Sequence, residues 1–514
     1  MNTRFLLGPL LAIGACTLQD AQEQPAPRAA IIVNGADRTG KADSRAALQR
    51  AIDTVAGRGG GTVYLPKGTY LLDTYRPSTH PWKFYNLRVP SNVTVEAEPG
   101  TILLQGPGGR APLPAKADRV ENNVIAVGTA NYQAVTFQDP ARNGGFRPAN
   151  PTAAGNSTLT LSNPADASGF SAGDLIVVYA ATSGDAIESE PTEVRSVDRA
   201  SGVLLLAHPL ARSFGHAFVA KVTTLATTHV SLRNLTIQGA IPLAATEVFD
   251  LSLYGCRLLY DNAAGGSNLV TGMTVNTIRG FHMENGSIEP AEGSFAGLEL
   301  PQRNSQDVLI ENVAFKVASA GFGEYGAHWK LIHNQFWIQP ARTTTAGIAI
   351  GGLDVDFEQN TIHGENLTAG GGSGALLTDA TGPPDYLEYI GHAVYRGNTI
   401  ECRADGNNCL RLTTRDPIVD HNQIAASGNA IAIKVEGAAA NFELTNNTIS
   451  CGAVPGLVLS VRDWSSGVVK GNLIKGTGPY AILLGMGSPA AAGKRLAAEN
   501  VVSGFAAAVR NVTP

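Results

Sequence analysis

Asparagine recurs at regular intervals through the second half of this 514-residue chain. Successive intervals are 22, 26, 38, 24, 25, 25 and 28 residues, and the recurring positions are Asn312, Asn334, Asn360, Asn398, Asn422, Asn447, Asn472 and Asn500. Each is followed within three residues by Ile, Phe or Val. A period in the twenties without helical spacing is typical of a β-solenoid, in which each repeat forms one coil. We therefore predict that these asparagines stack at one inner corner of successive coils, amide upon amide.

The composition agrees with many short strands joined by turns. The chain contains 58 glycines and 28 prolines, and only 16% of its residues are charged. A solenoid can reach this length with one continuous core, whereas a globular chain of the same size usually divides into domains. The net charge of −5 and the lack of a basic run argue against a nucleic-acid partner.

The N-terminus has the features of an export signal. Arg4 precedes an apolar run, Phe5 to Ala15, that is too short to span a bilayer. The run ends in Ile13-Gly-Ala-Cys16, which is similar to a bacterial lipobox, so residues 1–16 would be the signal segment and Cys16 would carry a lipid. The alternative is an ordinary signal peptide cut nearby. Residues 17–29 are rich in Gln, Pro and Ala and predict a linker. We expect an exported bacterial protein, periplasmic, outer-membrane-anchored or secreted, that touches a membrane only through such a lipid.

The other cysteines are Cys256, Cys402, Cys409 and Cys451. Export permits disulfides. Cys402 and Cys409 flank a turn-rich hexapeptide, so they form a local disulfide or remain two buried thiols. No spacing of Cys and His predicts a zinc site.

Residues 31–105 predict the entry to the solenoid. Asp43 or Ser44 can cap a helix that ends at the glycines of 57–61. Two short strands follow, at 62–65 and 69–72. The helix would cover the open end of the first coil, whose free backbone groups would otherwise invite edge pairing. The apolar face of this helix consists of Ala47, Leu48, Ala51, Ile52 and Val55.

This entry carries a family resemblance. The segments Asn34-Gly-Ala-Asp37, Asp43-Ser-Arg-Ala-Ala-Leu-Gln49 and Gly59-Gly-Gly-Thr-Val-Tyr-Leu-Pro-Lys-Gly-Thr-Tyr70 resemble the opening of pectate-lyase-superfamily proteins, in the pectate lyase 3-like N-terminal region. The match extends over about 75 residues. The resemblance implies an all-β fold, a right-handed single-stranded parallel β-helix with an N-terminal capping helix, and chemistry on carbohydrates.

The repeat rhythm is interrupted once. Within residues 120–225, short strand patterns at 175–178, 193–197 and 203–206 are separated by turns, which predicts a small antiparallel β module inserted between coils. The coils resume at 230. We therefore predict a parallel β-helix over residues 30–514 with an inserted β-rich module at 120–225.

Aligning the repeated strands by their alternation places a mixed acidic and basic strip on the outside of neighbouring coils. The candidate catalytic residues of this strip are Arg411, Lys434, Arg415, Glu299 and Glu324. Glu299 and Glu324 would suit a glycoside hydrolase, which needs two carboxylates. The cations would suit a uronate lyase, which needs positive charge against the sugar carboxylate and a base for the C5 proton. The strip is richer in cations, so we favour β-elimination.

Polar residues near this strip are candidates for substrate binding. They are Arg303, His328, Asp379, Tyr386 and His392. The long interval between Asn360 and Asn398 predicts a loop beside the strip. Asp354 and Asp356 alternate on one coil and could contribute to a Ca²⁺ site, and no other cofactor is expected.

Several observations limit the functional prediction. The Asn-Thr-Asp, Asp-Asp, Gly-His-Gly and Arg-Ile-Lys motifs of the polygalacturonase branch are absent, so the resemblance transfers no catalytic residue. Outward charges on a solenoid are often only its solvated face, and a non-catalytic glycan-binding or surface β-helix is the alternative of a different class. We expect a monomer that acts on an extracellular or periplasmic polysaccharide.

Overall fold

The computed structural model describes residues 30–511 apart from short internal segments. The segments outside the description are 79–81, 113–119, 129–145, 181–188, 216, 222–226, 262–270, 293, 295–301, 324–325, 339–346, 368–374, 380–390, 405–407, 438–440, 462–466 and 486–489. The predicted signal segment, Cys16 and the linker 17–29 also lie outside the described residues. In the part that is described, no helix has the length and apolar content needed to span a membrane.

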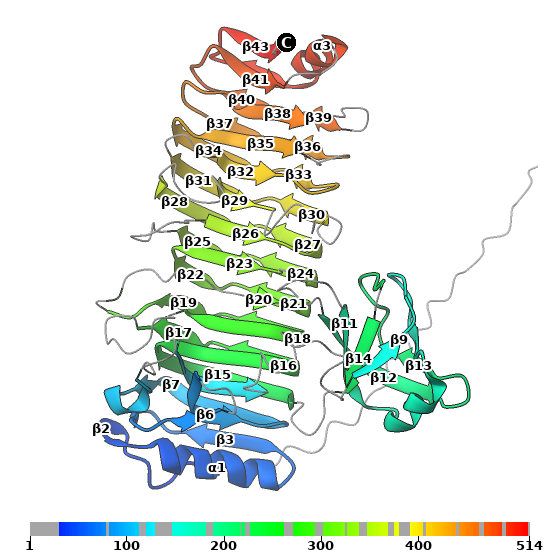
Figure 1. The fold of residues 1–514 in the computed structure, drawn as a ribbon. Coiled ribbons are helices and arrows are strands. Elements are labelled where there is room, and N and C mark those ends of the chain that lie inside the picture. The colour runs from blue at the N-terminus through cyan, green and yellow to red at the C-terminus, as the bar shows by residue number, and fades with distance from the viewer. Residues whose placement is uncertain are drawn as a thin grey trace, which may run out of the picture.

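The chain forms a parallel β-helix, as predicted. Figure 1 shows coils stacked along one axis, with helix α1 (Arg45–Gly57) at one end and α3 (Ala490–Glu499) at the other. A typical coil has one strand on each of three faces, and each strand pairs in parallel with the equivalent strand of the next coil. For example, Thr399 pairs with Gln423 and Gln423 with Thr448.

We number the faces in the order in which each coil visits them. Face 1 consists of β21 (Gln306–Glu311), β24 (Ala327–Ile332), β27 (Leu353–Glu358), β30 (Gly391–Arg396), β33 (Ile418–Asp420), β36 (Glu443–Thr445) and β39 (Val468–Lys470). Face 2 consists of β22 (Ala314–Val317), β25 (Gln335–Ile338), β28 (Thr361–Leu367), β31 (Thr399–Ala404), β34 (Gln423–Gly428), β37 (Thr448–Ser450), β40 (Leu473–Lys475) and β42 (Val501–Ser503). Face 3 consists of β23 (Ser319–Phe322), β26 (Gly347–Ile350), β29 (Ala375–Thr378), β32 (Asn408–Leu412), β35 (Ile431–Gly437), β38 (Leu457–Val461), β41 (Tyr480–Leu484) and β43 (Ala507–Asn511).

The first coils are built from longer strands that continue from one face to the next. Their elements are β1 (Ile31–Ile32), β2 (Thr39–Asp43), β3 (Gly61–Leu65), β4 (Thr69–Leu72), β5 (Arg76–Pro77), β6 (Lys83–Val89), β7 (Val93–Gln105), β8 (Glu121–Gly128), β15 (Thr227–Gly239), β16 (Ile241–Tyr254), β17 (Arg257–Tyr260), β18 (Met273–Glu284), β19 (Ser287–Pro290) and β20 (Gln302–Arg303).

The core is a column of apolar side chains inside the coils. Phe315 stacks on Phe336 with ring centroids 4.7 Å apart, and Phe357 lies 5.7 Å beyond. At the N-terminal end α1 buries Leu48 and Ile52 in the same core, so it is the capping helix that the sequence predicts.

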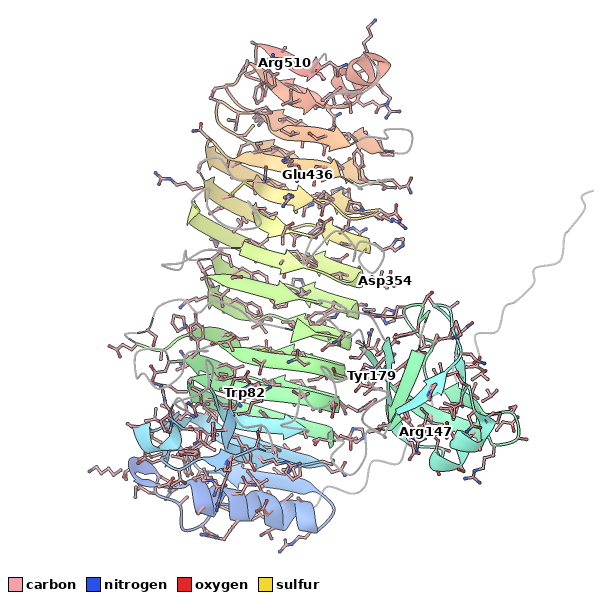
Figure 2. The ribbon with its side chains drawn as sticks, viewed as in Figure 1. Trp82, Arg147, Tyr179, Asp354, Glu436 and Arg510 are labelled. Carbon is pink, nitrogen blue, oxygen red and sulfur yellow. A yellow bond between two sulfur atoms is a disulfide. The ribbon has the colours of Figure 1, made fainter. Side chains whose placement is uncertain are left out.

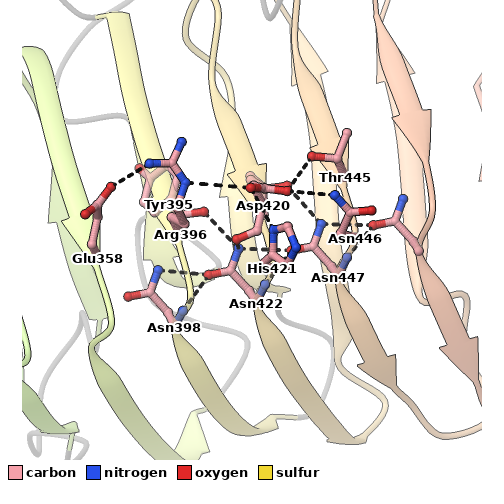
Figure 3. A network of polar contacts seen from close by, with 12 residues as sticks. Glu358, Tyr395, Arg396, Asn398, Asp420, His421, Asn422, Thr445, Asn446 and Asn447 are labelled. Atoms are coloured by element: carbon pink, nitrogen blue, oxygen red, sulfur yellow. Dashed lines mark hydrogen bonds and ion pairs between the residues drawn. The ribbon is translucent and has the colours of Figure 1, made fainter.

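The asparagine ladder lies at the buried corner between face 1 and face 2. In each coil the backbone N–H of one ladder asparagine donates to the side-chain oxygen of the next, as from Asn398 to Asn422 and from Asn422 to Asn447, both at 2.9 Å. The side-chain amide donates to a carbonyl of the preceding coil, as from Asn422 to Tyr395 at 2.8 Å (Figure 3). The buried members are Asn334, Asn360, Asn398, Asn422, Asn447, Asn472 and Asn500.

Asn312 was expected in this ladder, and the structure corrects that expectation. Its backbone has φ of 53° and it lies one position before the ladder, which Val313 occupies in that coil. Left-handed backbone favours Asn for a local reason, because its short side chain tolerates φ > 0. His421 and Asn446 have the same conformation at this position in later coils, with φ of 55° and 56°. Two neighbouring corner positions thus both select asparagine, which conceals the one-residue shift.

Replacing Asn422 with alanine should lower the free energy of unfolding by about 2–3 kcal/mol, because several buried groups lose their partners at once. Its side-chain oxygen accepts hydrogen bonds from the backbone N–H and from the side-chain amide of Asn398. Its own side-chain amide donates to the carbonyl oxygen of Tyr395. Thermal and denaturant unfolding would measure the change against Gln423→Ala, an exposed strand position next to it. Equal stability of the two variants would contradict a structural role for the ladder.

A disulfide joins Cys402 on β31 to Cys409 on β32, which confirms the first of the two sequence alternatives. It links face 2 to face 3 within one coil. Among the described residues, Cys256 and Cys451 are free thiols.

The inserted module is an antiparallel sheet beside the solenoid (Figure 1). Its strand order is β10-β13-β12-β11-β14-β9. It has its own apolar core, which includes Leu159, Ile176 and Phe214. Strand β8 falls within the range predicted for the module, but it pairs in parallel with β6 and β16 and so belongs to the solenoid. The module strands are β9 (Phe146–Ala149), β10 (Thr158–Thr160), β11 (Leu175–Ala180), β12 (Ser189–Asp198), β13 (Val203–Leu206) and β14 (Ala217–Lys221).

Candidate functional site

Two candidate cations of the sequence analysis meet on face 3. Arg411 on β32 and Lys434 on β35 are register partners on adjacent coils, so their side chains leave the sheet side by side. Glu436 lies between them, with its two carboxylate oxygens 2.5 Å from Arg411 Nε and 2.5 Å from Lys434 Nζ. Figure 2 labels Glu436 in the middle of this face. The triplet carries a net charge of +1 and is partly exposed.

Glu436 is ionised in this arrangement. Its partial burial tends to raise the pKa, but the hydrogen bonds from Lys434 and Arg411 outweigh burial and hold the pKa below its usual value. An ionised Glu436 fixes the two cations in one geometry. Both cationic side chains are partly exposed, that of Arg411 by 31% and that of Lys434 by 29%.

The outward column that ends in this triplet begins with small side chains. Gly321, Ala349, Thr378 and Arg411 are successive register partners on β23, β26, β29 and β32. Gly321 and Ala349 are half-buried and Thr378 is buried, and the first charged side chains of this column are Arg411 and Lys434.

The other predicted residues lie elsewhere. Arg415 follows β32 at the corner before face 1, where it forms an isolated β-bridge with Gly391. It therefore does not lie on the strands that carry Arg411 and Lys434.

Asp379 is fully buried and accepts hydrogen bonds from the backbone N–H and hydroxyl groups of Thr413 and Thr414. Burial raises the pKa of Asp379. A buried carboxyl with all its partners in the turn has a structural role.

Part of the predicted site lies outside the described residues. These positions are Glu299, Glu324 and Tyr386, together with the side chain of Arg303, whose backbone lies in β20.

The remaining predicted residues, His328 and His392, belong to a column at the corner between face 3 and face 1. Residues with positive φ recur at this corner, and in β21, β24, β27 and β30 they are the second residue of the strand and alternate between Asp and His. His328 Nδ1 lies 3.0 Å from Asp307 and its Nε2 lies 3.8 Å from Asp354. His392 is 4.0 Å from Asp416. The aligned members of the column are His229, Asp250, Gly280, Asp307, His328, Asp354, His392, Asp416 and Asn441.

The inserted module meets the solenoid beside this column. Arg279 on β18 is buried and forms an ion pair with Asp307 at 2.8 Å. Its guanidinium also donates to the carbonyl oxygen of Pro191 on β12 and lies 3.9 Å from Glu190. Figure 2 shows Asp354 at the edge of the solenoid that faces the module. Charged groups from the module and from four successive coils therefore gather at this junction.

The surroundings at this junction shift the pKa values of Glu190 and Asp307 in opposite directions. Burial raises the pKa of Glu190, although Arg212 and Arg279 oppose it. For Asp307 burial acts in the same sense, but the hydrogen bond with His328 and the charge of Arg279 prevail and lower the pKa. Perturbed groups beside one another are a feature of functional sites, and of structural ion-pair networks as well.

Sequence reasoning missed Arg279, Asp307 and Glu190. A signal was present in the sequence: His229 and Asp250 are 21 residues apart, as are Asp307 and His328, and this spacing is close to the length of one coil.

The sequence suggests Asp354 and Asp356 as contributors to a Ca²⁺ site. Within the described residues, no three His, Cys, Asp or Glu side chains converge to hold a metal ion.

Two protein-family models match the chain. The model described as "Rhamnogalacturonase A/epimerase, pectate lyase-like" matches residues 33–76, and the model described as "Right handed beta helix region" matches residues 303–493. These matches confirm the resemblance of the opening to pectate-lyase-superfamily proteins and the right-handed parallel β-helix fold. A search of curated proteins found no significant match.

Several solved structures are similar in fold. The A-module of a mannuronan C-5 epimerase of Azotobacter vinelandii is 12% identical, with a TM-score of 0.46, over 94% of this chain and 99% of that chain. A tailspike protein of a Pseudomonas phage is 14% identical, with a TM-score of 0.48, over 93% of this chain and 84% of that one. A surface adhesin of Streptococcus pneumoniae is 14% identical, with a TM-score of 0.45, over 88% and 90%. At these identities the likeness concerns the fold alone.

Proposed function

We propose that this chain is an exported enzyme that binds an acidic polysaccharide along face 3 and cleaves it by β-elimination at a uronic acid. The register pairing of Arg411 with Lys434 carries the proposal, because it places two cations on adjacent coils at one end of a column of small side chains. The match of residues 33–76 to a pectate lyase-like family model supports carbohydrate as the class of substrate.

The chemistry explains why paired cations matter. Removing the C5 proton of a uronate puts negative charge onto its carboxylate, and fixed positive charge against that group lowers the barrier. Arg411 and Lys434 can bind the carboxylate with charge-assisted hydrogen bonds. Glu436 holds both cations in position.

A panel of purified polysaccharides with product detection tests the proposal. We expect activity on one or more uronate-containing polymers, with products that absorb in the ultraviolet because elimination leaves a C4=C5 double bond conjugated to the carboxylate. New reducing ends without that absorbance would show a glycoside hydrolase instead. Binding without any cleavage would show a glycan-binding surface protein. A neutral polymer of similar length is the matched control, since the paired cations give it no carboxylate to hold.

A further inference from the structure

The outward column that carries Arg411 and Lys434 continues to the C-terminal end of face 3. Beyond Lys434, its successive register partners are Val458, Leu483 and Arg510, on β38, β41 and β43. Figure 2 labels Arg510 close to the C-terminal end of the solenoid. The column therefore carries a third cation, which two aliphatic side chains separate from the first two.

An aromatic ring holds Arg510 in place. The guanidinium carbon of Arg510 lies 5.1 Å from the centroid of the Tyr480 ring, which belongs to the neighbouring strand β41. A guanidinium over an aromatic face is attracted to the negative charge of that face, and the N–H donors at its edge stay available. Arg510 is exposed and Tyr480 is half-buried. The ring thus orients a cation that remains accessible from solvent.

Arg510 differs in its surroundings from other exposed arginines of the solenoid. Arg257 contacts Glu289 at 2.8 Å, and Arg396 contacts Glu358 at 3.0 Å. Arg510 forms no ion pair with any carboxylate in the part of the chain that the structure describes. An oriented guanidinium without such an internal partner is suited to bind a carboxylate of a ligand through two parallel N–H···O hydrogen bonds.

The distance between the cations suits an extended polysaccharide. Three strand spacings separate β35 from β43, which at about 4.8 Å each is roughly 14 Å along the axis. A sugar unit in an extended chain advances by a similar distance, so a chain parallel to the axis places one sugar over each coil. Between the cations Val458 is buried and Leu483 is half-buried, and this apolar surface suits the C–H faces of pyranose rings.

We propose that Arg510 and Tyr480 form a second carboxylate-binding site on face 3. This site holds a uronate about three sugars along the chain from the uronate bound by Arg411 and Lys434. The inference rests on the proposed function and deepens it, because it defines the substrate as a polysaccharide with carboxylates at least that far apart. The second site binds the chain and takes no part in the elimination.

A length preference follows from this geometry. A trisaccharide bound at Arg411 and Lys434 extends at most two sugars beyond them, short of Arg510, whereas an octasaccharide reaches both sites. A charge-assisted hydrogen bond to the second carboxylate contributes about tenfold in affinity. The wild-type protein should therefore have a higher kcat/KM on the octasaccharide than on the trisaccharide.

The test compares Arg510→Gln with Arg495→Gln in the full-length protein. Arg495 lies on α3 at the same end of the solenoid and is 52% exposed, so its substitution removes the same charge from a place outside the column. The substrates are oligosaccharides separated by length, prepared from the uronate polymer that gives unsaturated product or, if no polymer does, from the one that binds most tightly. We expect Arg510→Gln to lower kcat/KM or affinity about tenfold on the octasaccharide and to leave the trisaccharide unchanged. Arg495→Gln should match the wild type on both.

The division between kcat and KM separates a binding site from a reacting one. The loss in Arg510→Gln should lie in KM, because a carboxylate several sugars from the reacting carbon carries the same charge in the ground state and the transition state. The loss should also shrink as salt is added, because salt screens exposed charges. An effect mainly on kcat would contradict a remote binding site.

The role of the ring is tested separately. Tyr480→Phe keeps the aromatic face and should keep the wild-type KM on the octasaccharide. Tyr480→Leu removes that face and should raise KM by about 2- to 5-fold, the effect expected for an exposed cation–π contact. Equal KM values for the two variants would show that the ring does not orient Arg510.

The outcomes also separate this inference from the proposed function. If Arg510→Gln affects both lengths equally, or neither, the second site is overturned and the lyase function stands. Length-dependent binding that is lost in Arg510→Gln, without unsaturated product from any polymer, would support the site and overturn the elimination. No binding or cleavage of any uronate polymer by the wild-type protein would overturn both.

Discussion

Replacing Lys434 or Arg411 with alanine should lower kcat/KM on the acidic polysaccharide by about 10- to 100-fold. Each variant loses a charge-assisted hydrogen bond to the sugar carboxylate, worth roughly 1.5–3 kcal/mol, and each 1.4 kcal/mol is a factor of ten. The loss should appear in kcat as well as in KM, because the negative charge on this carboxylate grows as the C5 proton is removed.

The division between kcat and KM also tests the role that the sequence predicts for these cations. If Arg411 or Lys434 is the base, kcat itself should fall by about 10²–10⁴-fold. Lys475→Ala is the matched control, since it removes one exposed cation from β40 on face 2. If all three variants behave alike at low and high salt, face 3 does not bind the substrate through these side chains.

Much of the fold could be predicted because it is repetitive. The spacing of Asn398, Asn422 and Asn447 gives the length of a coil, and the alternation within each strand gives its inner and outer faces. The same reasoning placed Arg411 and Lys434 on neighbouring coils. Arg411 and Lys434 are direct register partners on β32 and β35, with the carboxylate of Glu436 in contact with both. These details depend on the register of the strands, which the spacing of the repeats does not determine.

The junction could not be predicted in the same way. Arg279 and Pro191 are 88 residues apart in the sequence and meet only because the module packs against the solenoid. Asp307 and His328 face each other because both adopt left-handed backbone at the start of a face 1 strand, a conformation that strand alternation does not reveal. The sequence therefore singled out His328 as polar and near the strip, but not its partners.

Replacing Arg279 with alanine should loosen the module and lower the free energy of unfolding by about 3 kcal/mol. Glu190 is fully buried and would lose one of the cations near it, and removal of one partner of a buried ion pair leaves a charge without adequate compensation. The carbonyl oxygen of Pro191 would lose its donor. Hydrogen exchange and limited proteolysis should show the effect first in β11 and β12, next to the junction.

Arg257→Ala is the matched control. Arg257 on β17 is 57% exposed and pairs with Glu289 on β19, which keeps Lys316 as a second partner, so its loss should cost at most about 1 kcal/mol. The deficit of Arg279→Ala should depend on pH. The folded state raises the pKa of Glu190, so stability is lost as the pH rises from the ordinary glutamate range toward the folded pKa. Arg279→Ala removes a cation that lowers the pKa of Glu190, so the folded pKa is higher in the variant and more stability is lost over this range. At pH values below the ordinary range Glu190 is protonated in both states and needs no counter-charge, so the part of the deficit that comes from Glu190 should disappear there, and the part that comes from the Pro191 carbonyl should remain. A deficit equal to that of Arg257→Ala at neutral pH would mean that the module is held by its other contacts and that Arg279 serves only to position Asp307.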